Sequence, residues 1–168
     1  LDLLDFRSVY KLLGVPTPQT SAEILHWMEG EKMIQSIDDA GYYILNFGVL
    51  SCAYNLNQFD GLSRKNVRVI KYKGVTKKET EKEQPGKKGY AIGYEGLINY
   101  IKALLPSSEI IKNALRTETT VYPEIALREL IANALIHQDF TIRGASPMIE
   151  IFDDRIEISN PGKLLPSK

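Results

Sequence analysis

The chain has 168 residues, of which 43% are apolar and 25% are charged, so it can form one ordinary domain or two small ones with a real core. Lysine plus arginine equals aspartate plus glutamate at 21 each, which excludes a global positive charge as the basis of nucleic-acid binding and leaves only a local basic patch. The single cysteine, Cys52, excludes an internal disulfide, and no apolar run approaches the roughly 20 residues of a membrane span. We therefore expect a cytoplasmic protein without a membrane partner.

The first third of the chain predicts two helices followed by a strand. Apolar residues recur at helical spacing in residues 1–13 and again in residues 20–33, with glycine and prolines between the two segments. An acidic turn at Asp38 and Asp39 then leads to a strand at residues 42–47. This order is typical of a winged-helix start. An acidic turn suits phosphates poorly, so a small packing subdomain is the favoured interpretation.

The middle of the chain alternates between apolar segments and a charged one. Residues 67–72 predict a strand and residues 94–105 a helix, whereas residues 48–57 fit either. Between them, residues 73–89 interleave lysines with glutamates and contain almost no apolar residue, which predicts a mobile surface loop rather than a nucleic-acid surface. Threonines in residues 110–121 favour extended backbone.

A helix predicted for residues 126–140 carries an unusual polar stripe. Glu129, Asn133 and His137 follow one another at intervals of four, so they share one narrow face. The other positions are mostly isoleucine, leucine and alanine on every side, which predicts a buried helix. A carboxylate and an amide facing inward from such a helix need partners or a ligand, because burying them unpaired is costly.

Two strands follow, at residues 147–152 and 155–159, joined by a tight turn at Asp153 and Asp154. Directly after them, Asn160 to Gly162 form an Asn-Pro-Gly bend, where glycine lets the backbone approach a flat ligand closely. The Asn160 amide can hydrogen-bond the amine of a base.

The Glu129 stripe fits the chemistry of a metal-bound triphosphate. Mg²⁺ prefers hard oxygen ligands, often one or two from protein with phosphate oxygens and waters completing the octahedron. The side-chain oxygen of Asn133 can supply one ligand, and Glu129 can hold and deprotonate a water in line with a γ-phosphate. His137 and Asp139 are more simply explained as a helix-end residue and a capping residue.

Residues 126–140 (ALRELIANALIHQDF) and 149–162 (IEIFDDRIEISNPG) together resemble the GHKL, or Bergerat-fold, ATPases. That resemblance implies that Glu129 is the general base, that Asn133 is the Mg²⁺ ligand, and that Asn160 and Gly162 belong to the first glycine box, which holds ATP. More narrowly, the chain is similar to the RecG-related transcriptional regulators, often labelled ATP-dependent DNA helicase-like. In those proteins a Schlafen/AlbA-type DNA-binding domain precedes this region.

The resemblance implies an α+β fold in two regions. Residues 1–115 would form a helix-and-strand middle region, and residues 116–168 the first half of a GHKL-like sandwich in which a helix packs on an antiparallel hairpin. The chain departs from the family pattern at Asn160, where aspartate is usual, and at Leu164, where a second glycine is expected. It also lacks the G-x-x-x-x-G-K-[S/T] motif of a helicase motor.

We expect the chain to be a piece of a longer DNA-binding regulator, because it begins without methionine and stops just after a turn. Its partners would be a nucleotide with Mg²⁺, DNA through flanking domains, and possible further copies of itself. Two alternatives remain open: a degenerate fold kept as a non-catalytic scaffold or dimerisation module, and a direct DNA-binding module that uses the lysines of residues 73–89.

Overall fold

The computed structural model describes residues 2–38, 41–112 and 115–162, and it divides into two compact units. The first unit comprises residues 1–66 and 87–94, and the second comprises residues 67–86 and 95–168. Each unit is therefore built from two separate stretches of chain. From the sequence we expected two consecutive regions, residues 1–115 and 116–168. The two units differ from these regions because residues 68–71 pair with residues 148–151 in the sheet of the second unit.

The first unit is a small helical cluster with one hairpin. It contains α1 (Phe6–Leu13), α2 (Ser21–Gly30), the antiparallel strands β1 (Ile34–Ile37) and β2 (Gly41–Ile44), and α3 (Asn46–Cys52), followed by single 3₁₀ turns at Leu56–Gln58 and Ser63–Lys65. Its core consists of buried aliphatic side chains with the thiol of Cys52: Leu4, Val9, Ile24, Met28, Met33, Ile34, Val49, Leu50, Cys52, Ala53 and Leu56.

The start of α2 is fixed by a capping box. The Thr20 hydroxyl accepts from the backbone nitrogen of Glu23 at 3.3 Å, and the Glu23 carboxylate accepts from the backbone nitrogen of Thr20 at 3.2 Å. The helix–helix–hairpin order is also present. Asp39, half of the predicted acidic turn, lies outside the described residues.

The second unit is organised around a four-stranded sheet in the order β4-β3-β7-β8. Strands β3 (Arg68–Tyr72) and β7 (Met148–Ile151) pair in parallel at its centre, although they are far apart in the sequence. Strands β4 (Thr80–Pro85) and β8 (Ile156–Ser159) lie at the two edges, each antiparallel to its neighbour. The predicted hairpin turn at Asp153 and Asp154 is present between β7 and β8.

The prediction that residues 73–89 form only a mobile loop is wrong. Residues 80–85 form β4, all of whose side chains are exposed. The glutamates of β4 form ion pairs with cations on the neighbouring strand β3: Glu83 with Arg68 at 2.5 Å and Glu81 with Lys71 at 3.1 Å. The polar composition of residues 80–85 is therefore that of an exposed edge strand, which needs no apolar face of its own. Its charged side chains also disfavour pairing of this edge with a strand of another molecule.

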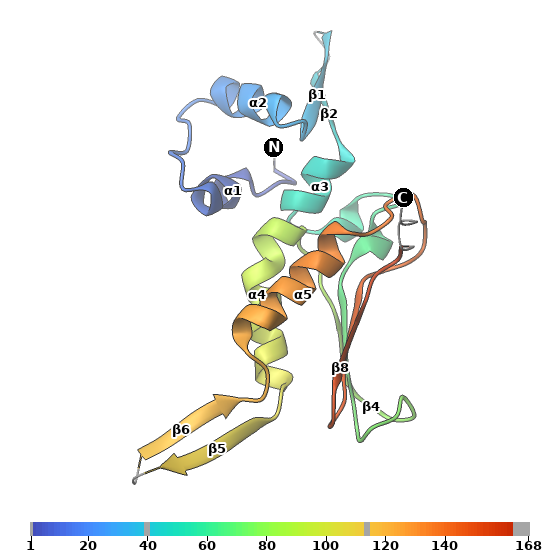
Figure 1. Ribbon diagram of the computed structural model, residues 1–168. Coiled ribbons are helices and arrows are strands. Elements are labelled where there is room, and N and C mark those ends of the chain that lie inside the picture. The colour runs from blue at the N-terminus through green and yellow to red at the C-terminus, as the bar shows by residue number, and fades with distance from the viewer. Residues whose placement is uncertain (1, 39–40, 113–114, 163–168) are drawn as a thin grey trace, which may run out of the picture. The chain divides into compact units, whose positions relative to one another are not determined.

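Two helices cover one side of this sheet, as Figure 1 shows. α4 (Tyr90–Leu104) begins in the first unit and continues into the second, where Ile98 and Ile101 are buried. It lies beside α5 (Glu124–Ile136), to which it is joined by an ion pair between Arg128 and Glu95 and another between Lys102 and Glu124. The backbone between them forms the hairpin of β5 (Ser107–Lys112) and β6 (Leu115–Thr120), in agreement with the extended backbone predicted there.

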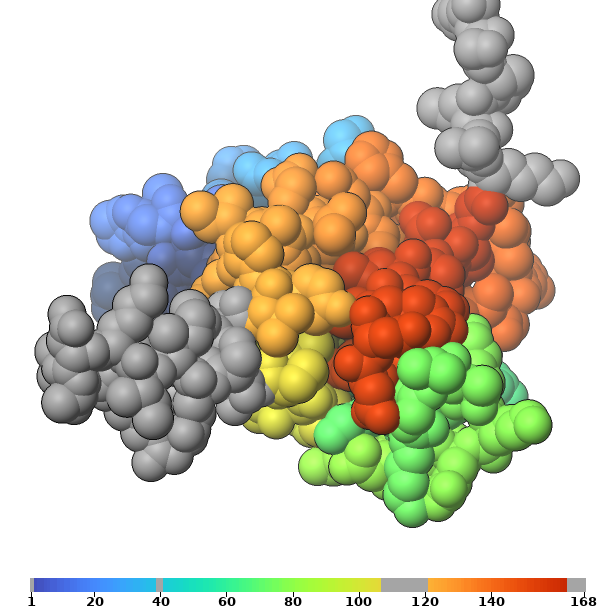
Figure 2. Space-filling view, turned by 60° about the horizontal axis from the view of Figure 1, so that its bottom comes forward, coloured from blue at the N-terminus to red at the C-terminus, as the bar shows by residue number. Residues whose placement is uncertain are grey.

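α5 is buried along one face only, so the prediction of a helix buried on every side is wrong. Leu127, Ile131 and Leu135 face the interior, at successive intervals of four. By contrast, Ile125 is 84% exposed and Ile136 is 67% exposed. The sheet of this unit can cover only one side of the helix. Among the described residues no second layer covers the other side, and Figure 2 shows α5 (orange) at the surface beside the β7–β8 hairpin (red).

Candidate functional site

The polar stripe on α5 lies on the exposed side of the helix, not on the inward side that we expected. Glu129 and Asn133 each follow a buried residue by two positions, which is about 200° around the helix axis. Both side chains are exposed. The Asn133 amide donates to Oε1 of Glu129 at 3.1 Å, so the two satisfy each other along the helix surface.

Asn133 nevertheless lines a pocket at the flank of α5. This pocket, of about 410 Å³, lies between the helix and the edge strand β8. Its polar lining comes from three side chains, Asn133, His137 and Asn160. Its apolar lining comes from Leu130 and Ala134 on the helix and from Ile156 and Ile158 on the strand. Two of the residues predicted from the sequence, Asn133 and Asn160, thus meet in one cavity, whereas Glu129 and Gly162 are not part of its lining.

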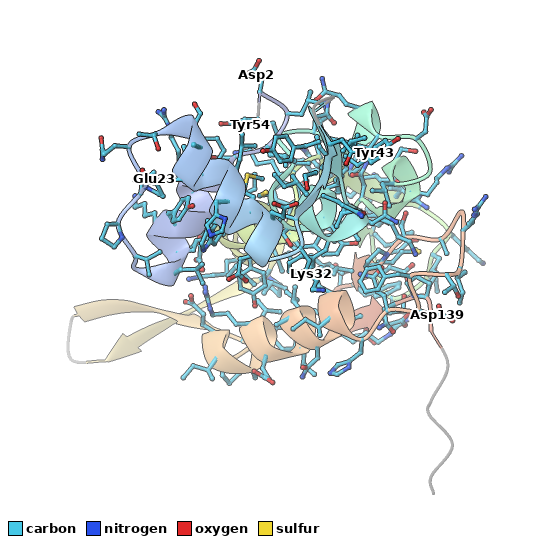
Figure 3. All side chains as sticks on the ribbon, turned by 90° about the horizontal axis from the view of Figure 1, so that it is seen from above. Asp2, Glu23, Lys32, Tyr43, Tyr54 and Asp139 are labelled. Carbon is cyan, nitrogen blue, oxygen red and sulfur yellow. The ribbon has the colours of Figure 1, made fainter. Side chains whose placement is uncertain are left out.

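The Asn-Pro-Gly bend is held against the end of α5 by backbone contacts. The Asp139 nitrogen donates to the Pro161 carbonyl at 2.7 Å, and in Figure 3 Asp139 lies just past the end of α5. A Cβ atom at Gly162 would lie 3.3 Å from the His137 carbonyl oxygen and 3.5 Å from the Asp139 nitrogen. Gly162 therefore has a packing reason to be glycine. Its predicted contact with a ligand stays a prediction.

The residues that follow α5 form turns. Asp139 Oδ1 accepts from the backbone nitrogen and hydroxyl of Thr141, at 2.9 and 2.5 Å. Gly144 has a φ of 76°, which suits a surface turn. This local structure directs the chain away from the helix end and into β7.

A charged network fastens the β3–β4 connection to the β7–β8 hairpin. Glu150 is buried, and its carboxylate accepts from the Tyr72 hydroxyl at 3.0 Å and from Lys77 at 2.7 Å. Hydrogen bonds from Arg155, and next from Lys77, hold the pKa of Glu157 below its ordinary value. On β8, Glu157 lies between the pocket-lining residues Ile156 and Ile158, so its side chain is on the opposite face of the sheet. Glu150 is its partner on β7. The network therefore stabilises β8 without lining the pocket.

Sequence patterns missed Glu150 and Lys77, since their contact joins residues 73 positions apart. The same applies to the pocket walls Ile156 and Ile158, which appear in the sequence only as ordinary strand residues. The alternation of β8 was the one available signal.

A second hollow, of about 780 Å³, belongs to the first unit. It is lined by residues of the N-terminal segment, of α1 and α2 and of the loop between them, and by Tyr54: Asp2, Leu4, Phe6, Arg7, Thr17, Pro18, Gln19, Ser21, Ile24 and Tyr54. Asp2 and Tyr54 are labelled in Figure 3. It contains none of the site residues predicted from the sequence.

Neither a metal cluster nor a membrane helix is found where the structure is described. In residues 2–38, 41–112 and 115–162, no three histidine, cysteine, aspartate or glutamate side chains gather closely enough to hold a metal ion. Within the same ranges, none of the helices has both the length and the apolar character needed to cross a membrane.

Comparison with known proteins supports a relation at the C-terminal end of the chain. Residues 144–168 match the family described as "Putative ATP-dependent DNA helicase recG C-terminal". This match includes β7, β8 and the Asn-Pro-Gly bend, but nothing in it supports the Schlafen/AlbA part of the sequence prediction. Leu164, in the matched range, lies outside the described residues. No curated protein matches the chain.

The fold is similar to that of a solved structure, the DIP2311 protein from Corynebacterium diphtheriae. The TM-score is 0.59 at 13% sequence identity, with 89% of this chain matched to 37% of that one. The chain therefore spans little more than a third of that protein's length. The likeness confirms the α+β fold class predicted from the sequence and carries no statement about activity.

Proposed function

We propose that this chain is part of a RecG-related DNA-binding regulator and that its second unit binds a nucleotide with Mg²⁺ in the pocket between α5 and β8. The observation that carries the proposal is that Asn133 and Asn160, from separate sequence motifs, line the same cavity. The family match over β7, β8 and the following bend supports it. DNA would be contacted by other parts of the parent protein.

The side chains of the pocket suit this ligand. Aliphatic walls on two elements can hold a flat ring, and the amides and imidazole can hydrogen-bond its polar atoms. The Asn133 oxygen can serve as one hard ligand, and the phosphates of a bound nucleotide would supply further oxygens to Mg²⁺. Glu129, one turn away and in contact with Asn133, can orient a water molecule.

Direct DNA binding through residues 73–89 is less favoured. Lys73 pairs with Glu79 and Lys77 with Glu150, so part of the positive charge of this segment is already engaged by carboxylates. Lys71, on the neighbouring strand, pairs with Glu81. A phosphate backbone would have to compete with these pairs.

A thermal unfolding experiment on the 168-residue chain tests the proposal. A ligand that binds only the folded state raises the melting temperature, by about 3 °C for each kcal/mol of binding in a protein of this size. We expect millimolar ATP with Mg²⁺ to raise Tm by several degrees. Asn133→Ala and Asn160→Ala should lose most of this rise, whereas Glu129→Gln should keep it, because Glu129 is outside the pocket lining.

Asn99→Ala is the matched control, because Asn99 is an exposed asparagine on α4 outside the pocket lining. It should respond to ATP like the unchanged chain. If the unchanged chain gains no stability from ATP with Mg²⁺, the nucleotide pocket is refuted and the non-catalytic scaffold becomes the better account.

A further inference from the structure

The three polar side chains of the α5–β8 pocket share one chemical property. Asn133 and Asn160 each carry an amide with both a donor and an acceptor, and an imidazole such as that of His137 can offer one ring nitrogen as donor and the other as acceptor. No carboxylate and no ammonium or guanidinium group belongs to the lining. The Asn133 amide is oriented by its donation to the Glu129 carboxylate, which only accepts. The Asn160 amide can turn over and exchange its donor with its acceptor, so at this position the pocket imposes no fixed hydrogen-bond polarity on its ligand.

The apolar part of the pocket selects by shape. Leu130 and Ala134 form a wall on the helix side, and Ile156 and Ile158 form one on the strand side. Asn160 follows Ile158 by two positions, at the end of that strand-side wall. A planar ring placed between the walls therefore presents its edge to Asn160.

The 6-amino and 6-oxo purines differ at that edge. Adenine offers a donor at its amino group next to an acceptor at N1, and guanine offers an acceptor at O6 next to a donor at N1. An asparagine amide can pair with both atoms of either edge, in one orientation or the other.

We propose that the pocket accepts 6-amino and 6-oxo purine nucleotides alike, with Asn160 reading whichever edge is present. This inference rests on the proposed nucleotide site and adds to it the class of base. The specificity is then for a purine ring between aliphatic walls and not for adenine.

Calorimetric titration of the 168-residue chain at pH 8 with ATP, GTP and CTP, each with Mg²⁺, tests the inference. A lost bidentate pair costs on the order of five- to a hundredfold in affinity. We expect the dissociation constants for ATP and GTP to agree within about fivefold and CTP to bind more weakly than either, because its smaller ring leaves part of the walls uncovered. A difference of more than about fivefold between ATP and GTP overturns the inference.

Asn160→Ala provides the second arm, with Asn99→Ala as the control of matched chemistry. If Asn160 reads both edges, its removal should weaken ATP and GTP by the same factor, about fivefold or more. Weakening of one purine alone, or of neither, overturns the inference. Preference for ATP in the unchanged chain leaves the proposed function standing, whereas failure of every nucleotide to bind removes both.

Discussion

At the scale of single residues, burial lowers the reactivity of the Cys52 thiol. Its side chain is fully buried, and its thiol donates to the Gly48 carbonyl at 3.2 Å. Burial, with a smaller contribution from the charge of Asp5, raises the pKa of Cys52 from 9.0 to about 11. The thiolate is the nucleophilic form, so Cys52 is a small apolar residue of the core, in agreement with the sequence interpretation.

We predict that Cys52 is unreactive in the folded protein. At pH 8 a pKa near 11 leaves about one thiol in a thousand ionised, and the side chain is shielded as well. Iodoacetamide should label it slowly in the native state and rapidly in denaturant, as followed by mass spectrometry. Because the folded pKa is the higher one, this thiol stabilises the fold below pH 9, and its contribution is lost as the pH rises toward 11. Equal labelling rates in both states would contradict the burial.

The places of the candidate site residues in the fold were predictable only where a local motif contained them. The sequence placed Asn133 on a helix and Asn160 in a bend after a strand, and the structure has both. The sequence could not show that Glu129 is exposed. When apolar residues occur on every side of a helix, their pattern does not indicate which side packs against the sheet. The packing of Leu127 and Ile131 settles that question.

At the scale of elements, α5 carries apolar residues on both a buried and an exposed side. Ile131 is fully buried, and Ile136, five residues later, is 67% exposed. The same residue type in the same helix thus experiences two environments. This pair gives a direct test of the face that packs on the sheet.

We predict that Ile131→Ala lowers the free energy of unfolding by about 2–5 kcal/mol, since it removes buried methyl groups and leaves a cavity. Ile136→Ala should change it by no more than about 0.5 kcal/mol, because its side chain already meets solvent. Urea denaturation of both variants measures the difference. Similar losses in both would show that the exposed face of α5 is covered, as the sequence had suggested.

Strand β4 and helix α3 illustrate which elements a sequence reveals. Apolar residues at helical spacing located α2, and the tight turn at Asp153 and Asp154 located β7 and β8. By contrast, β4 is polar at every position and is fixed by its ion pairs to β3. For residues 48–57 the apolar run was too short to decide. The structure places the end of α3 and a 3₁₀ turn there, held by packing in the first core.

At the scale of the whole molecule, long-range pairing determines the organisation. The parallel pairing of β3 with β7 brings residues 67–86 into one sheet with the C-terminal hairpin. No local pattern predicts such a pairing, because its partners are separated by α4, the β5–β6 hairpin and α5. The α+β class was predictable from the mixture of elements, but the composition of the two units was not.

We propose above that the pocket between α5 and β8 binds the nucleotide. Backbone amide NMR spectra of the 168-residue chain, recorded during titration with ATP against a Mg²⁺-only reference, test it most directly. We expect shifts concentrated at pocket-lining residues such as Ala134, His137, Ile158 and Asn160, while the signals of Phe6 and Gln19 in the hollow of the first unit do not move. An unchanged spectrum, or shifts centred on that first-unit hollow, would contradict it.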